Sequence, residues 1–161
     1  MVLDDGFLRD CINRVFPEVI KVRRDFHMWP ELGFQEIRTQ ARIVEILSSL
    51  GMPVKQGIAK TGVIGLLTGR KKEVSLHDKE KVIAFRADID ALPVTEDTGL
   101  EFSSKNPGVM HACGHDFHAA ILLGAAMVLS LLTEHFSGHV KFIFQPAEEN
   151  LGGGKSLVQE G

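Results

Sequence analysis

The feature that most constrains this chain is the alternation of helix-like and strand-like hydrophobic patterns along its length. Residues 36–50 place apolar side chains at helical spacing and stop at Gly51, and residues 115–134 form a second, strongly apolar helical stretch. Short apolar runs at 82–86 and 139–145 are instead typical of buried strands. Helices that alternate with buried strands favour an α/β fold. We therefore predict the α/β class.

The remaining segments are interpreted by the same rules. Residues 3–28 show helical spacing, and Pro17 is expected either to split them into two helices or to lie in the first turn of the second helix. The polar stretch 69–81 is typical of a surface hairpin or loop. Two strands and one short helix complete the prediction, at 53–57, 62–68 and 155–160.

Composition narrows the class of function. The 161 residues contain 44% apolar and 24% charged side chains and carry a formal net charge of −3, so we expect neither nucleic-acid nor membrane binding. The longest apolar run, 119–132, is too short for a membrane span, and the acidic N-terminus does not resemble a signal peptide. Two distant cysteines, Cys11 and Cys113, form no disulfide framework, so a reducing compartment, the cytoplasm, is expected.

The stretch HACGHDFHAA at 111–120 predicts a metal site. Cys113 and His115 offer a thiolate and an imidazole one residue apart, which suits zinc and similar ions, and the following helix N-terminus is expected to lower the thiol pKa. Alternatively, the cysteine is a buried core residue and the histidine is a capped surface residue. A further alternative makes Cys113 a nucleophile with His111 or His115 as its base. Further polar side chains accompany the pair: His111, Asp116 and His118.

Acidic residues follow two of the predicted strands. Glu148 and Glu149 come after 139–145 and a proline, so one carboxylate can bind metal while the other acts as a general base. Asp88 and Asp90 alternate after 82–86, and a carboxylate there can orient a metal-bound imidazole. A solvated acidic loop and a turn with Asx hydrogen bonds are the plainer interpretations. Since sites in α/β sheets form at the carboxyl ends of strands, these loops and HACGHD are expected to converge.

Two further motifs receive a structural interpretation. GGGKS at 152–156 resembles part of a phosphate-binding loop, but the full pattern requires glycine where this chain has Glu149. Its glycines are therefore expected to permit close backbone packing beside the site. The stretch HMWPELGFQE, which begins at His27, indicates only a capped turn between two helices.

Four stretches together resemble one known family. They are HMWPELGFQE, FRADIDALPVTE, GVMHACGHDFHAAILLGAA and FIFQPAEENLGGGKSLVQEG, in order and in rough register from His27 onward. The family is that of the metal-dependent amidohydrolases, which includes aminoacylase-like enzymes, hippurate hydrolases, auxin-conjugate hydrolases and related carboxypeptidases. The resemblance implies the N-terminal part of a zinc-exopeptidase-like catalytic domain, with a central mixed β-sheet flanked by helices.

The resemblance also implies roles for particular residues. Cys113, His115 and Glu149 match the metal ligands, and the cysteine can bridge two ions. Glu148 matches the general base, and Asp90 matches the acidic residue that supports the metal site. The cofactors implied are two divalent ions, which are zinc, manganese, cobalt or nickel in different members. The reaction implied is hydrolysis of the amide bond of a small N-acyl amino acid or a similar conjugate.

The chain departs from the family in two respects. Phe117 stands where glycine is common, so a more crowded turn is expected before the helix. Family members are also much longer, so residues 1–161 are expected to be an incomplete N-terminal segment of the catalytic metal-binding domain, without the inserted dimerisation domain. A homodimer is expected only for the full-length form. The alternative is a catalytically inactive fragment that acts, if at all, through self-association or partner binding.

Overall fold

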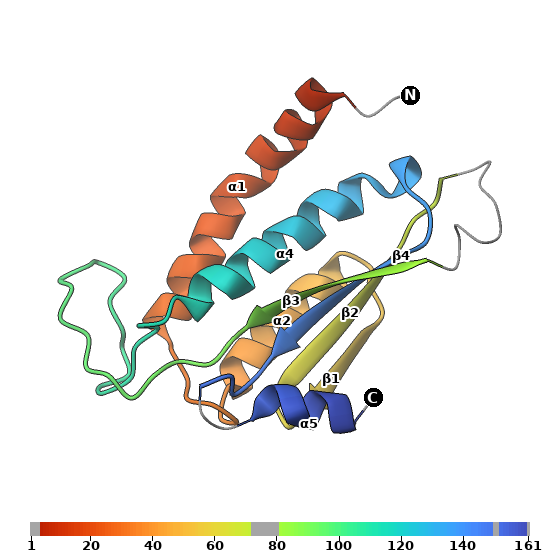
Figure 1. Ribbon diagram of the computed structural model, residues 1–161. Helices are drawn as coiled ribbons and strands as arrows, with labels where there is room; N and C mark the ends of the chain where they lie inside the picture. The colour runs from red at the N-terminus through yellow and green to blue at the C-terminus, as the bar shows by residue number, and fades with distance from the viewer. Residues whose placement is uncertain (1–3, 72–80, 150–151, 161) are drawn as a thin grey trace.

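A four-stranded mixed sheet organises the computed structural model, which describes residues 4–71, 81–149 and 152–160 (Figure 1). The strands are β1 (Val54–Ile58), β2 (Gly62–Thr68), β3 (Val82–Asp88) and β4 (His139–Gln145). Their order in the sheet is β1-β2-β4-β3. The pairs β1–β2 and β2–β4 are antiparallel, whereas β3 and β4 are parallel. The predicted α/β class with a mixed sheet is confirmed.

The helices pack against this sheet and against one another. They are α1 (Asp5–Met28), α2 (Ile37–Ser49), α4 (His115–Leu131) and the short α5 (Gly153–Gln159), with a 3₁₀ turn at Thr133–His135. Helices α2 and α4 both contact the sheet, and α1 lies along α4 (Figure 1). Phe142 and Phe144 of β4 are fully buried beneath them. Each such side chain contributes about 1.5–3 kcal/mol of transfer free energy.

Helix α1 is continuous over 24 residues although Pro17 lies inside it. The prediction that Pro17 either divides residues 3–28 or begins a second helix is wrong. Pro17 and Asn13, whose carbonyl loses its helical N–H partner, both lie on the exposed side of α1, where water can replace that partner. On the other side, Val22 and Phe26 are buried in the core, and this packing keeps the helix in one piece.

Most other predicted elements lie where they were expected. The predicted strands at 62–68 and 139–145 coincide with β2 and β4, and α4 ends three residues before the predicted limit. Most of the predicted loop at 69–81 falls on residues 72–80, which lie outside the described residues. Among the helices that the structure describes, none is long and apolar enough to cross a membrane.

The parallel pairing of β3 and β4 positions the candidate site. The register aligns Asp88, the last residue of β3, with Gln145, the last residue of β4. The Ile89 N–H continues this pairing by donating to the Gln145 carbonyl at 3.0 Å. The loops after both strands therefore leave the sheet side by side, and the first turn of α4 faces them (Figure 1).

Candidate metal centre

Asp90 joins the three segments that form the candidate centre. The Nδ1 atom of His115, at the start of α4, lies 3.1 Å from Asp90 Oδ1 and 3.0 Å from the Asp90 carbonyl oxygen. The other carboxylate oxygen, Oδ2, accepts a hydrogen bond from the Glu149 N–H at 2.9 Å. Asp90 itself is 1% exposed. One buried carboxylate therefore fixes both a histidine ring and the loop after β4.

These contacts determine the charge of both groups. Burial alone raises the Asp90 pKa, but hydrogen bonds from His115 and from the backbone N–H groups of Glu149 and Glu148 outweigh it, so the pKa is below its ordinary value. Burial lowers the His115 pKa, but the bond to Asp90 and the charges of Asp90 and Asp88 outweigh it, and the pKa is raised. Asp90 is therefore an anion that keeps a proton on Nδ1 of His115. The free nitrogen is Nε2.

The Nε2 side of His115 meets a thiol and a carboxylate. Cys113, His115 and Glu149 each offer one potential metal-ligand atom, and these three atoms lie within 4.8 Å of one another. His115 Nε2 is 4.0 Å from Glu149 Oε1 and 3.9 Å from Glu148 Oε2. Thiolate, imidazole and carboxylate donors together suit zinc and related divalent ions. The structure thus brings together the residues predicted as ligands and places the predicted base beside them.

The thiol of Cys113 behaves differently from the prediction. A hydrogen bond with Glu149 raises its pKa, and desolvation and the charges of Glu149, Glu148 and Asp90 act in the same direction. The expectation that the helix N-terminus lowers this pKa is wrong, because the carboxylates around the sulfur dominate. Without a cation the group is therefore a protonated thiol, which argues against Cys113 as an independent nucleophile.

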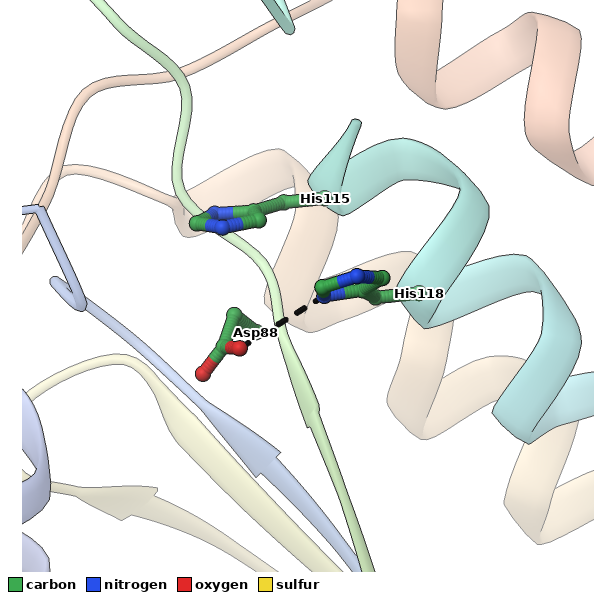
Figure 2. A group of neighbouring side chains, drawn as sticks. All are labelled: Asp88, His115 and His118. Carbon is green, nitrogen blue, oxygen red and sulfur yellow. Dashed lines mark ion pairs between the residues drawn. The ribbon is translucent and has the colours of Figure 1, made fainter. Parts of the chain in front are cut away.

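His115 also belongs to a second group of potential ligands. Donor atoms of Asp88, His115 and His118 lie within 4.8 Å of one another, and Figure 2 shows both rings above the Asp88 carboxylate. His118 Nδ1 is 3.5 Å from Asp88 Oδ2, and the two rings stack at 5.2 Å. Asp88 Oδ2 also accepts from Arg86 Nη2 at 3.1 Å, whereas Oδ1 is buried without a hydrogen-bond partner in the described part of the chain. Asp88 is thus already paired with a cation.

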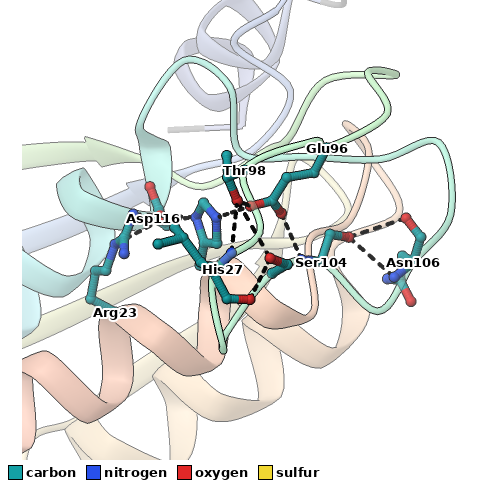
Figure 3. A network of polar contacts seen from close by, with 9 residues as sticks. Arg23, His27, Glu96, Thr98, Ser104, Asn106 and Asp116 are labelled. Carbon is teal, nitrogen blue, oxygen red and sulfur yellow. Dashed lines mark hydrogen bonds and ion pairs between the residues drawn. The ribbon is translucent and has the colours of Figure 1, made fainter.

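Behind the centre lies a buried polar network that local sequence patterns did not indicate (Figure 3). Asp116, the second residue of α4, lies 2.7 Å from His27 Nδ1 and 3.0 Å from Arg23 Nε. His27 Nε2 lies 3.1 Å from Glu96 Oε1. Glu96 in turn accepts from the Ser104 N–H at 2.6 Å. The interpretation of His27 as part of a simple capped turn is wrong, because its partners lie far along the chain.

Phe117 does not crowd the turn before α4. Its side chain is 51% exposed, and the guanidinium carbon of Arg23 lies 4.0 Å from the centre of its ring. The expected crowding at this position is therefore not observed. The aromatic ring instead covers the cation that pairs with Asp116, an arrangement that favours the charged guanidinium.

His111 is buried between the candidate centre and this network. It is 5% exposed, and neither ring nitrogen has a hydrogen-bond partner among the residues that the structure describes. Burial lowers the pKa of His111 to about 4. The imidazole is therefore neutral near pH 7.

The loop after β4 is held by tight backbone packing. Ala147 has a left-handed φ of 50°, and its carbonyl oxygen accepts a hydrogen bond from the Gly153 N–H at 3.0 Å. A Cβ atom at Gly153 would lie 1.7 Å from the Pro146 carbonyl oxygen, so no side chain fits there. The interpretation that the glycines allow close packing beside the site is confirmed at this position.

The chain was compared with known proteins. The family model described as "Peptidase family M20/M25/M40" matches residues 84–161. Thermostable carboxypeptidase 1 of Saccharolobus solfataricus is 43% identical over 157 residues, which are 96% of this chain and 38% of that protein. The N-acyl-L-amino acid amidohydrolase of Geobacillus stearothermophilus is 43% identical over 155 residues, 96% of this chain and 40% of that protein.

A solved structure extends the comparison to the fold. The Bacillus subtilis YXEP protein, described as a dinuclear metal-binding peptidase from the M20 family, superposes with a TM-score of 0.82 at 44% identity. The match covers 92% of this chain and 40% of that one. The fold is that of the M20 peptidases. The chain belongs to peptidase family M20/M25/M40, and it spans about 40% of the length of the curated relatives that it matches.

Proposed function

We propose that the protein hydrolyses the amide bond of N-acyl amino acids or similar small conjugates with the help of divalent metal ions. The observation that carries this proposal is the convergence of Cys113, His115 and Glu149 within 4.8 Å, with Asp90 fixing both His115 and the backbone of Glu149. A buried carboxylate behind a histidine ligand is the usual arrangement in protein metal sites. Relatives named as amidohydrolase and carboxypeptidase support the reaction class.

In this proposal each residue has a defined role. Cys113, His115 and Glu149 hold metal, and Asp90 keeps the Nδ1 proton of His115 in place so that Nε2 can bind. Two divalent ions, as in the dinuclear relative, supply the Lewis acidity that polarises the substrate carbonyl. Glu148 accepts a proton from the attacking water and passes it to the leaving amine. The Glu148 side chain is 41% exposed, so water and substrate can reach it.

We extend the proposal to the chain as a whole. Residues 1–161 supply the N-terminal segment of a catalytic metal-binding domain, and the longer form is a homodimer. The share of the relatives' length that the chain matches, about 40%, supports the first part of this statement. The second part is tested by the mass of the longer protein in solution.

The role of Glu148 is tested by the variant Glu148→Gln, made in whichever form of the protein, the 161-residue chain or the longer one, shows amide hydrolysis. Hydrolysis of a panel of N-acyl amino acids should fall about 10²–10⁴-fold, the usual contribution of a general base. Metal content, measured by elemental analysis, should stay unchanged. The matched control is Glu45→Gln, which removes an exposed glutamate charge on α2. Unchanged hydrolysis by Glu148→Gln with metal still bound would refute the assigned role.

A second candidate function is association with another polypeptide through β3. Among the described residues β3 is an end strand of the sheet, and Val82, Ile83 and Phe85 are 54%, 60% and 47% exposed. An exposed apolar edge strand is a template for pairing with another chain. Sedimentation over a range of concentrations tests this candidate: Ile83→Lys should reduce any self-association, and equal behaviour of both proteins would contradict it.

A further inference from the structure

We propose that Glu36 is a positioning residue, which fixes the loop of Glu148 and Glu149 from the side opposite Asp90. The inference rests on the proposed function of that loop. Its starting point is the unusual use of a carboxylate at the beginning of α2.

Glu36 precedes α2 but does not cap it. Its side chain makes no hydrogen bond to the first turn of that helix. Glu31 makes those bonds instead: it accepts from the backbone N–H groups of Arg38 and Thr39 at 3.0 and 2.8 Å, and from the Thr39 hydroxyl at 2.9 Å. The Glu36 carboxylate is therefore available for contacts elsewhere in the fold.

Those contacts are buried and lead to the β4 loop. Glu36 is 0% exposed. Its Oε2 accepts a hydrogen bond from the hydroxyl of Thr61, the residue before β2, and its Oε1 accepts from the Ala147 N–H at 2.9 Å. A fully buried carboxylate is costly unless such donors satisfy it, so the arrangement constrains all three segments together.

The bond to Ala147 acts at the point where the loop reverses. Ala147 is fully buried and has a left-handed φ of 50°, which non-glycine residues seldom adopt. The preceding residue, Pro146, has no N–H to contribute. The Ala147 carbonyl already accepts from the Gly153 N–H, so the hydrogen bond that the Ala147 N–H donates to Glu36 completes the pairing of both backbone polar groups of this residue. The direction in which Glu148 and Glu149 leave the turn follows from this conformation.

Two carboxylates thus hold the same loop at points two residues apart. Asp90 accepts the Glu149 N–H from the side of His115, and Glu36 accepts the Ala147 N–H from the side of α2 and β2. Glu36 touches none of the proposed ligands. It acts only through the backbone, which distinguishes positioning from catalysis.

The test uses three variants of Glu36 and one control. Glu36→Ala removes the acceptor, and Glu36→Asp keeps the charge but is one methylene too short to reach Thr61 and Ala147 together. Glu36→Gln keeps the length, can accept from Ala147 and can donate to Thr61. The control is Glu31→Gln, which disturbs the start of the same helix without contacting the loop.

Two readouts are measured on each protein. The first is hydrogen exchange at the Ala147 and Glu149 amides. The second is binding of Co²⁺ alone, followed by its visible absorption. We expect Glu36→Asp and Glu36→Ala to exchange at least about tenfold faster at Ala147 and to bind Co²⁺ about 10–100-fold more weakly, the usual effect of losing a supporting contact. Glu36→Gln should retain most of the exchange protection at Ala147 and most of the Co²⁺ affinity. Glu31→Gln should match the unmodified chain in both measurements.

The outcomes separate this inference from the proposed function. If Glu36→Asp leaves exchange at Ala147 unchanged, or if Glu31→Gln accelerates it equally, the positioning role is overturned. If the unmodified chain binds no Co²⁺ while Ala147 exchange still responds to Glu36→Asp alone, the loop contact stands and the proposed metal function fails. If Glu36→Ala does not fold, the aspartate and glutamine variants still decide between these results.

Discussion

The imidazole of His115 lies between two groups of potential ligands that differ in their charge. Toward Cys113 and Glu149, the neighbouring groups are a thiol and carboxylates, and the backbone of Glu149 is fixed by Asp90. Toward Asp88 and His118, the carboxylate is already paired with Arg86 at 3.1 Å, and His118 is 51% exposed on its side chain. In both groups the potential ligand atoms lie within 4.8 Å of one another.

This difference shows that geometry alone does not select a cation site. Since Asp90 holds Nδ1 of His115, only Nε2 can bind a cation, and the two groups compete for it. The Arg86 guanidinium beside Asp88 weakens the attraction of that carboxylate for a cation. The carboxylates near Cys113 instead raise the thiol pKa, and this unrelieved negative charge is what a cation would neutralise. We therefore expect binding at Cys113, His115 and Glu149.

The largest effect is expected from Cys113→Ser. Replacing the soft thiolate by a hydroxyl removes one of three ligands from the favoured group and leaves the Asp88 group intact. Zn²⁺ affinity, measured by competition with a chromophoric chelator, should fall at least about 100-fold. An affinity within threefold of the unmodified chain would show that the Asp88 group holds the ion instead.

Asp90→Asn should give the next largest effect. The amide can still accept from the Glu149 N–H, but it lacks the charge that keeps the His115 proton on Nδ1. Loss of such a supporting group costs about 10–100-fold in metal affinity. The same chelator competition measures the Zn²⁺ affinity of this variant. The control is Asp97→Asn, which changes an exposed aspartate on the following loop. Equal affinity for both variants would contradict the role of Asp90.

Acidification should weaken cation binding by about tenfold for each pH unit between 8 and 7. The Cys113 pKa is raised above its ordinary 9.0, so the thiol must release a proton upon binding throughout this range. The His115 pKa is raised above 6.5, so protonation of Nε2 adds to the loss toward lower pH. Calorimetry in buffers of different ionisation enthalpy counts the protons released, and the absence of proton release would exclude the thiol as a ligand.

His118→Ala should have the smallest effect. If the Cys113 group holds the cation, removal of His118 changes the affinity less than about threefold, because the variant loses only the stacking on the His115 ring and the contact with Asp88, neither of which involves Cys113 or Glu149. The chelator competition applied to Cys113→Ser measures this variant as well. A tenfold loss would reverse the assignment and favour the group that contains Asp88.

Local sequence patterns were sufficient to predict those elements in which the environment of each residue follows from its neighbours in the sequence. The apolar run of 139–145 ends at a proline and forms a strand, and the amphipathic stretch at 36–50 forms α2 before Gly51. The convergence of Cys113, His115 and Glu149 was also predicted. The loops that carry Asp90 and Glu149 follow parallel strands and meet at one edge of the sheet, and the start of α4, which carries His115, lies against them. The roles assigned to these residues remain predictions.

Other features depend on contacts that no local pattern records. The continuity of α1 through Pro17 depends on its packing along α4. The raised thiol pKa of Cys113 depends on carboxylates that arrive from another loop. The side chain of His27 contacts Asp116, which lies 89 positions further along the chain. In its own segment each of these residues resembles an ordinary polar side chain.

The bond between Glu36 and Ala147 joins residues 111 positions apart, and this separation has a consequence for the order of folding. Closing so long a segment costs more chain entropy than forming a helix or a hairpin, so contacts of this kind form slowly. The Glu148–Glu149 loop reaches its final direction only after α2, β2 and β4 have come together. We therefore expect the candidate cation site to be among the last parts of this chain to form, so that cation binding would report on nearly complete folding.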